Sequence, residues 1–199
     1  MTNYWNVIKN KLSKEDGIIS VGFADIIGGG ISAIFWLYVA SVMNPENYGE
    51  IHYFLAIAGM AQIFSMVGNS HALTVYSAKK ENIQSTLFIL STIPTIISCI
   101  IIIMIFDRFD AGLLAIGYVV FESVNAVVLG RKFYRKYAKI ILIQKSLTMF
   151  IGISFFYAFG PDGIIFALAL TFVPHLVIFI KEFYNTKIDF ALLKPRKNF

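Results

Sequence analysis

Four ionisable residues lie inside long apolar stretches of this 199-residue chain: Asp25, Glu122, Lys145 and His175. A charged side chain at membrane depth is costly unless it is paired or hydrated, so such residues usually contact an ion, a proton or a substrate. Asn125 follows Glu122 by three residues and so falls on the same helical face. These five residues are therefore candidates for a substrate or ion pathway.

Helix geometry predicts that the four ionisable residues lie at similar depths. Asp25 and Glu122 are each about eight residues from the basic end of an apolar stretch, which corresponds to roughly 12 Å at about 1.5 Å per residue. Lys145 and His175 are about five residues in, or roughly 8 Å. All four are expected to form one polar layer in one half of the membrane.

Each candidate also has a purely structural explanation. Lys145 is shallow enough to extend its amine to the membrane surface, and Glu122 could form a structural ion pair with it. The His175 imidazole could bond a backbone carbonyl that Pro174 leaves free. Asp25 has no cation near it in the sequence, so for this residue the functional explanation is favoured.

Three consecutive glycines, Gly28, Gly29 and Gly30, lie in the first apolar stretch. Together with Ala24 and Ala33 they form two pairs of small residues at a spacing of four, Ala24/Gly28 and Gly29/Ala33. Such pairs allow a second helix to approach closely, and this explanation of the glycines is favoured. Bending of the helix during a conformational cycle is the alternative. Pro94 and Pro174 give two further points at which an expected helix could bend.

Composition places the chain in a membrane. Hydrophobic residues make up 57% of it and charged residues 15%, and the mean hydropathy is +0.71. Soluble domains carry about 25% charged residues, so soluble and disordered classes are excluded. Apolar runs of about 20 residues can cross the hydrocarbon core as helices. Six are expected, at 17–43, 51–67, 85–106, 111–130, 140–159 and 164–180.

The expected fold is therefore an all-α, polytopic, six-helix transmembrane bundle. Its parts are a cytoplasmic N-terminal segment (1–16), the transmembrane domain (17–180) and a basic cytoplasmic tail (181–199). Alternating strand patterns are absent, so a transmembrane barrel is not expected. The first apolar stretch is too long for a cleavable signal peptide and is expected to remain as a helix.

The basic residues predict the orientation of these helices. Fifteen of the seventeen lie in the two termini and in the second and fourth connections, whereas the opposite connections hold only Arg108. The positive-inside rule then places both termini of a multi-pass cell-membrane protein in the cytoplasm. Attraction to anionic lipids of the inner leaflet explains the basic fourth connection, and no nucleic acid partner is expected.

The sequence contains no recognisable catalytic motif. It lacks a phosphate-binding loop, a His-Glu-x-x-His pair and a nucleophile elbow. The single cysteine, Cys99, cannot form an internal disulfide and lies in an apolar run. We therefore expect a protein that is not an enzyme and that has no cofactor and no metal site.

A short segment after the first apolar stretch carries a family pattern. It contains Pro45, Glu46 and the pair Tyr48-Gly49. The segment resembles the loop between the first two helices of polysaccharide and oligosaccharide flippases, which belong to the multidrug/oligosaccharidyl-lipid/polysaccharide exporter superfamily. Three further segments fall where that family has comparable stretches: 68–76, 130–137 and 160–163.

The resemblance implies the N-terminal lobe of such a flippase, with six helices lining a central cavity. Family members move a lipid-linked sugar pyrophosphate from the inner to the outer leaflet by alternating access, usually without ATP. In that framework Asp25 and Glu122 would bind a coupling cation or proton, and Lys145 would attract the lipid-linked phosphate. Because the family has two lobes, a homodimer or a second lobe is the implied partner, besides the lipid bilayer.

Two other functions remain open. The chain could be a non-transporting membrane subunit or degenerate lobe that packs against a partner, in which case the polar layer would hold helices together. It could also be a small exporter of a different substrate.

Overall fold

A computed structural model of the chain describes residues 2–81 and 83–185, with side chains from Gly17 onward except that of Ile18. The described residues form helices and connections without a strand, which confirms the all-α class. The helices are α1 (Thr2–Val42), α2 (Pro45–Ser65), α3 (Asn69–Ala78), α4 (Gln84–Phe106), α5 (Phe109–Gly130), α6 (Tyr134–Phe159), α7 (Gly163–Leu170) and α8 (Val173–Tyr184).

By length and composition, five segments of the described chain can each cross a membrane. They are Ile19–Val42, Gln84–Phe106, Phe109–Gly130, Tyr134–Phe159 and Gly163–Tyr184. The helices α2 and α3 make a sixth crossing if they count as one span, because they pass the same criterion together and are bent by 55° at their junction. The expected polytopic membrane bundle is confirmed.

Local turn chemistry explains where several helices begin and end. The Asn44 side chain caps α2 by accepting a hydrogen bond from the Asn47 N–H at 2.9 Å, and Pro45 follows at the first turn, where its missing N–H costs nothing. Asp107 ends α4 in the left-handed region, at φ 53°. Gly160 ends α6 at φ 74°, a conformation that favours glycine.

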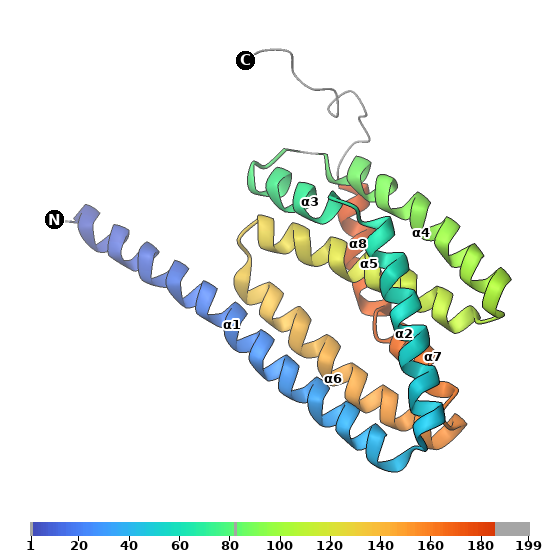
Figure 1. Ribbon diagram of the computed structural model, residues 1–199. Coiled ribbons are helices and arrows are strands. Elements are labelled where there is room, and N and C mark those ends of the chain that lie inside the picture. Colours follow the sequence, from blue (N-terminus) through green and yellow to red (C-terminus); the bar gives the residue numbers. More distant parts are fainter. Residues whose placement is uncertain (1, 82, 186–199) are drawn as a thin grey trace.

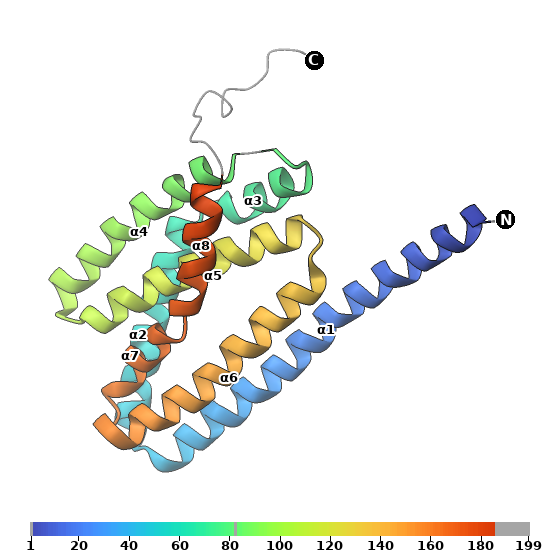
Figure 2. The ribbon, with the colours of Figure 1, turned by 180° about the vertical axis from the view of Figure 1, so that it is seen from behind.

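The bundle is organised around α5, whose apolar window is 67% buried, against 22–28% for α1, α4 and α6. In Figure 1, α1 and α6 lie side by side along one edge of the molecule, and α4 and α5 lie along the other. Figure 2 shows α8 lying across α4 and α5 from behind. Phe88 of α4 and Phe179 of α8 stack there, with ring centroids 4.4 Å apart.

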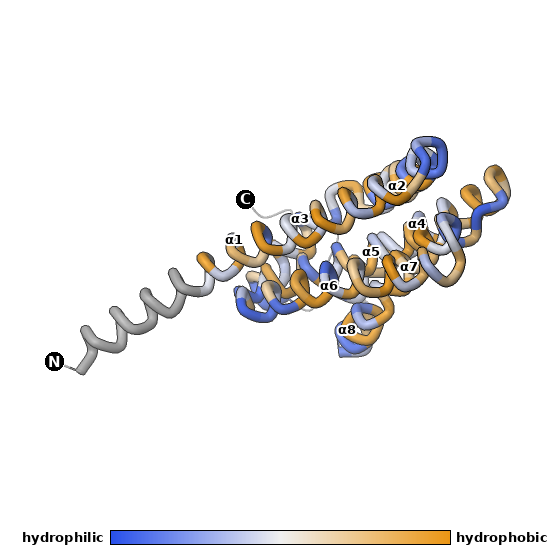
Figure 3. The backbone as a smooth tube through the Cα atoms, turned by 90° about the horizontal axis from the view of Figure 1, so that it is seen from below, coloured by the Kyte–Doolittle hydropathy of each residue, from blue (hydrophilic) through white to orange (hydrophobic). Residues whose placement is uncertain are grey.

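A large aromatic residue fixes the α1–α6 seam. The Phe35 side chain is fully buried, and a Cβ atom placed on Gly152 of α6 would lie only 2.7 Å from its ring. Gly152 therefore makes the room that lets α6 approach α1 closely. Figure 3 shows the hydropathy of the chain: hydrophobic residues dominate the helices, and hydrophilic residues gather at several turns.

The connections alternate between the two ends of the bundle. In Figure 1, the α3–α4 and α5–α6 connections lie toward the end that also holds the start of α1 and the end of α8, and the α1–α2, α4–α5 and α6–α7 connections lie at the opposite end. We call the first the terminal end and the second the distal end. The range 1–16, expected as a separate segment, is helical from Thr2. Most of the expected basic tail, residues 186–199, lies outside the described residues.

Candidate functional site

The helices α1 and α2 meet near their connection and then diverge toward the terminal end (Figure 1). Three rings join them at the distal end, since Trp36 lies 6.2 Å from Tyr48 and 4.6 Å from His52 between ring centroids. A cavity of about 310 Å³ lies between the two helices, with α5, α6 and α7 behind it. Its polar lining consists of Ser32, Gln62, Glu122, Gln144, Lys145 and Thr148. We call this space the central cavity.

Glu122 reaches the central cavity from α5, and a hydroxyl group holds it there. Ser70 of α3 donates a hydrogen bond to the Glu122 carboxylate at 2.7 Å. This bond satisfies one lone pair of one oxygen and leaves the carboxylate free to accept further donors or a cation. Glu122 therefore has a fixed position and unused capacity for a ligand.

Lys145 enters the central cavity from α6, opposite α1. A Cβ atom on Gly28 of α1 would lie 3.2 Å from the Lys145 Cγ, so the lysine stem packs directly on that glycine. No carboxylate of the described residues lies within ion-pair distance of the Lys145 amine. The structural ion pair between Glu122 and Lys145, which was one alternative from the sequence, is therefore not formed. The cavity thus contains a cation without an anionic partner in the described chain.

Asp25 lies outside the central cavity, on the exposed side of the α1–α6 seam. The Tyr137 hydroxyl of α6 donates to its carboxylate at 3.3 Å. Glu122 has a different partner, Ser70, and it lines the cavity whereas Asp25 does not. Asp25 and Glu122 therefore do not share one site.

His175 and Asn125 are both buried and neither lines the central cavity. The His175 ring packs edge-on against Phe121 at 5.0 Å between centroids, close to the backbone of Ile140 and Phe172. The backbone N–H of His175 donates a hydrogen bond to the Phe172 carbonyl at the junction of α7 and α8. The Asn125 Oδ1 atom has no hydrogen-bond partner among the described atoms. The expected polar layer is thus divided between the cavity and the packed interior.

The glycines and prolines proposed for packing or bending occupy different environments. Gly28 packs against Lys145, whereas a Cβ on Gly29 or Gly30 would meet nothing within 4 Å. The helix α1 continues through all three glycines without a break. Pro94 lies inside α4, and Pro174 lies in the first turn of α8, after the break at residues 171–172.

The family-like loop has a clear structural role. Pro45 and Glu46 form the first turn of α2 behind the Asn44 cap, and a Cβ on Gly49 would meet nothing within 4 Å. Tyr48 packs on His52 with ring centroids 4.4 Å apart and joins the aromatic contact with α1. This loop therefore joins α1 and α2 through aromatic contacts at the distal end.

Two polar contributors were not expected from the sequence. Gln62 lines the central cavity from the apolar run of α2, and Ser70 holds Glu122 from the turn of helix beyond the α2–α3 bend. An uncharged polar residue inside a membrane span is a usable signal for Gln62, because such groups usually find a partner or a wet cavity. No comparable signal marks Ser70, since its role depends on the bend that points α3 toward α5.

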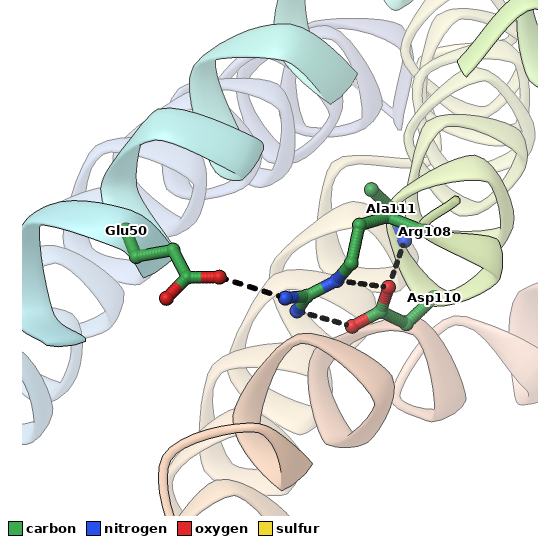
Figure 4. A network of polar contacts seen from close by, with 4 residues as sticks. All are labelled: Glu50, Arg108, Asp110 and Ala111. Carbon is green, nitrogen blue, oxygen red and sulfur yellow. Dashed lines mark hydrogen bonds and ion pairs between the residues drawn. The ribbon is translucent and has the colours of Figure 1, made fainter. Parts of the chain in front are cut away.

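An ion-pair network at the distal end was also unexpected. Figure 4 shows Arg108, from the α4–α5 turn, between Glu50 of α2 and Asp110 of α5. The Arg108 guanidinium donates to Glu50 at 2.9 Å and makes two bonds to Asp110 at 3.0 and 2.8 Å. Hydrogen bonding to Asp110 raises the pKa of Arg108 above its usual value. The guanidinium also lies 4.4 Å from the centre of the Phe54 ring.

These features define a class: a helical membrane bundle with five or six candidate spans and a polar cavity lined from α1, α2, α5 and α6. No protein-family model matches the sequence, and no curated protein does. A solved structure of a MATE protein in complex with Br-NRF matches the fold with a TM-score of 0.64 and 18% sequence identity. The match covers 92% of this chain and 52% of that one, so this chain spans about half the length of the MATE protein. The chain therefore has a fold similar to about half of that MATE protein.

Proposed function

We propose that the chain is one half of a membrane transporter that moves a lipid-linked oligosaccharide or polysaccharide precursor from the inner to the outer leaflet by alternating access. The observation that carries this proposal is the central cavity, where Lys145 lies without a carboxylate partner from the described residues. An unpaired cation inside a membrane lobe is costly, and the phosphate groups of such a substrate would compensate it.

The shape of the cavity supports a substrate that is partly polar and partly apolar. Amide and hydroxyl groups from Gln62, Gln144 and Thr148 supply hydrogen bonds of the kind that sugars use. Trp36 and Tyr118 supply aromatic surface in the same cavity. In this proposal the headgroup occupies the cavity between α1 and α2 while the lipid chain remains in the bilayer.

The acidic candidates suggest how transport is coupled. In this proposal Glu122, held by Ser70, binds a coupling cation or proton in the cavity. Asp25 contributes from the neighbouring α1–α6 seam, where Tyr137 donates a hydrogen bond to it. Neutralising Glu122 when a cation binds would change its attraction to Lys145 and so would link ion binding to substrate release.

A second lobe is needed to close the pathway. This chain spans about half the length of the matching MATE protein, and all the described lining of the central cavity comes from this one lobe. A second copy of the chain, forming a homodimer, would supply the other half of the pathway, and a separate second lobe would do so equally well. In the membrane, the proposed orientation places both termini in the cytoplasm.

Export of a small compound is the second candidate function, because the matching solved structure is a MATE transporter. The test reconstitutes the full chain in proteoliposomes and compares flipping of a fluorescent lipid-linked oligosaccharide with uptake of small organic cations. The proposal predicts flipping of the lipid-linked sugar only. Uptake of organic cations without flipping would overturn it in favour of the second candidate. Absence of both activities in a stable homodimer would instead indicate a non-transporting subunit.

A further inference from the structure

The helices α3 and α5 both end at the terminal end with the same type of C-terminal cap. The α3 helix ends with the Lys80 N–H bonded to the Ser77 carbonyl and the Glu81 N–H bonded to the Tyr76 carbonyl. The α5 helix repeats this pattern. The Lys132 N–H donates to the Leu129 carbonyl, and the Phe133 N–H donates to the Val128 carbonyl. Both are Schellman caps, which require a left-handed residue, usually glycine, just after the helix.

In both caps the left-handed position holds a lysine. Lys80 has φ 59° and Lys132 has φ 60°. A side chain in this conformation costs free energy that glycine would avoid. The partial negative charge of the helix C-terminus favours a cation there, and neither lysine has a carboxylate within ion-pair distance in the described chain.

Both lysines line one cavity of about 520 Å³ between the two caps. Arg131 is the third cation of its lining, and Glu182 of α8 neutralises it through an ion pair of 2.8 Å. The remaining charge of the cavity is therefore carried by Lys80 and Lys132. Close packing of α3 on α5 fixes the distance between the caps, because a Cβ on Gly130 would lie 2.8 Å from the Ser77 Cβ.

The wall of this cavity adds hydrogen-bond donors. Ser77 and Gln84 are 1% and 2% exposed, and their side chains share one hydrogen bond of 3.4 Å. A serine hydroxyl and a glutamine amide carry three N–H or O–H donors between them, so one shared bond leaves two donors unused whichever way the amide is turned. Two cations and two spare donors are a suitable set for phosphate oxygens.

We infer that this cavity is a binding site for the phosphate of an anionic phospholipid headgroup, such as that of phosphatidylglycerol. The lipid is favoured over soluble phosphate by position, because the cavity lies where the apolar spans Gln84–Phe106 and Phe109–Gly130 end, at the depth of headgroups. The exposed Phe133 ring on its rim would contact acyl chains. This inference does not depend on the proposed transport function.

The test measures phosphatidylglycerol binding to the purified full chain in a non-ionic detergent by native mass spectrometry. The critical variant, Lys80→Gly/Lys132→Gly, removes both charges while keeping the backbone that the caps require. Its affinity for phosphatidylglycerol is expected to fall about 30-fold, because each lysine contributes about fivefold. The matched control, Lys139→Gln/Lys181→Gln, removes two charges that do not line the cavity and should change affinity by less than about threefold.

Two further arms keep the inference falsifiable. Lys80→Arg/Lys132→Arg should bind like the wild type, and a melting temperature of the glycine variant at or above the wild-type value would show that its fold is intact. Equal losses in the glycine and control variants would overturn the inference in favour of diffuse charge attraction. Wild-type binding by the glycine variant, or equal binding of phosphatidylcholine, would also overturn it. Displacement of the lipid by millimolar inorganic phosphate would reassign the cavity to a soluble phosphate.

Discussion

The distal end and the central cavity use positive charge in opposite ways. At the distal end Arg108 makes ion pairs with Glu50 and Asp110 and lies over the Phe54 ring. In the central cavity Lys145 has no carboxylate partner in the described chain, although Glu122 lines the same space. A paired charge joins helices, whereas an unpaired charge in a membrane lobe must be compensated by water or by a ligand. The comparison therefore predicts that Arg108 contributes to stability and that Lys145 binds a ligand.

The largest effect on function is expected from Lys145→Met. Methionine keeps much of the stem that packs on Gly28 but removes the charge. Loss of a charge-assisted contact costs about 1.5–3 kcal/mol, so flipping of the lipid-linked oligosaccharide should slow by roughly 10–150-fold. The melting temperature should not fall, because no ion pair is broken. A lower melting temperature with unchanged flipping would reverse the assignment made by the comparison.

The largest effect on stability is expected from Arg108→Met. This change removes both ion pairs of the distal end and should lower the free energy of unfolding by about 1–3 kcal/mol. Glu50→Gln is the matched partial change; since the Glu50 side chain is 50% exposed, it should cost less than about 1 kcal/mol. Thermal unfolding in detergent measures both. Equal losses from the two variants would show that the Asp110 pair contributes nothing.

A third prediction concerns the coupling role of Glu122. Glu122→Gln keeps a carbonyl oxygen that can accept from Ser70 but removes the charge that would bind a cation or proton. Transport by this variant should lose its dependence on the ion gradient while substrate binding persists. The measurement compares flipping by the variant with and without an imposed pH or sodium gradient. A preserved dependence on the gradient would exclude Glu122 from coupling.

The smallest functional effect is expected from Asp25→Asn. Asp25 is exposed and accepts one bond of 3.3 Å from Tyr137 outside the central cavity. The same gradient assay should show a change of less than about threefold. A loss as large as that of Glu122→Gln would place Asp25 in the coupling site itself.

Two glycines, one packed between α1 and α6 and one on an open face of α1, add a contrast in packing. Gly152→Ala places a methyl group 2.7 Å from the buried Phe35 ring and should cost about 1–3 kcal/mol of unfolding free energy. Gly29→Ala meets nothing within 4 Å and should stabilise α1 by up to about 1 kcal/mol through helix propensity. Melting temperatures of the two variants should therefore move in opposite directions.

The membrane fold was predictable because it depends on apolar length, which a sequence displays directly. Gln84–Phe106 and Phe109–Gly130 agree closely with the expected spans 85–106 and 111–130. The bend between α2 and α3 was not foreseen, because the left-handed Gly68 at the start of α3 and the helix beyond it carry little apolar signal.

The candidate site was only partly predictable, because depth follows from position along a helix but the direction of a side chain depends on packing. Glu122 and Lys145 both line the central cavity. His175, at a comparable expected depth, packs between Phe121 and the α7–α8 break instead. The Arg108 network depends on contacts between α2 and the α4–α5 turn, which are far apart in the sequence.

The most direct test of the central claim uses the single cysteine of the chain. In a Cys99→Ala background, Ser32→Cys places one thiol on the wall of the central cavity. We predict that a lipid-linked sugar pyrophosphate slows labelling of this thiol by a maleimide at least about tenfold, that the uncharged lipid alcohol does not, and that adding Lys145→Met removes the protection. Labelling that the pyrophosphate lipid leaves unchanged, or protection that survives Lys145→Met, would contradict the account.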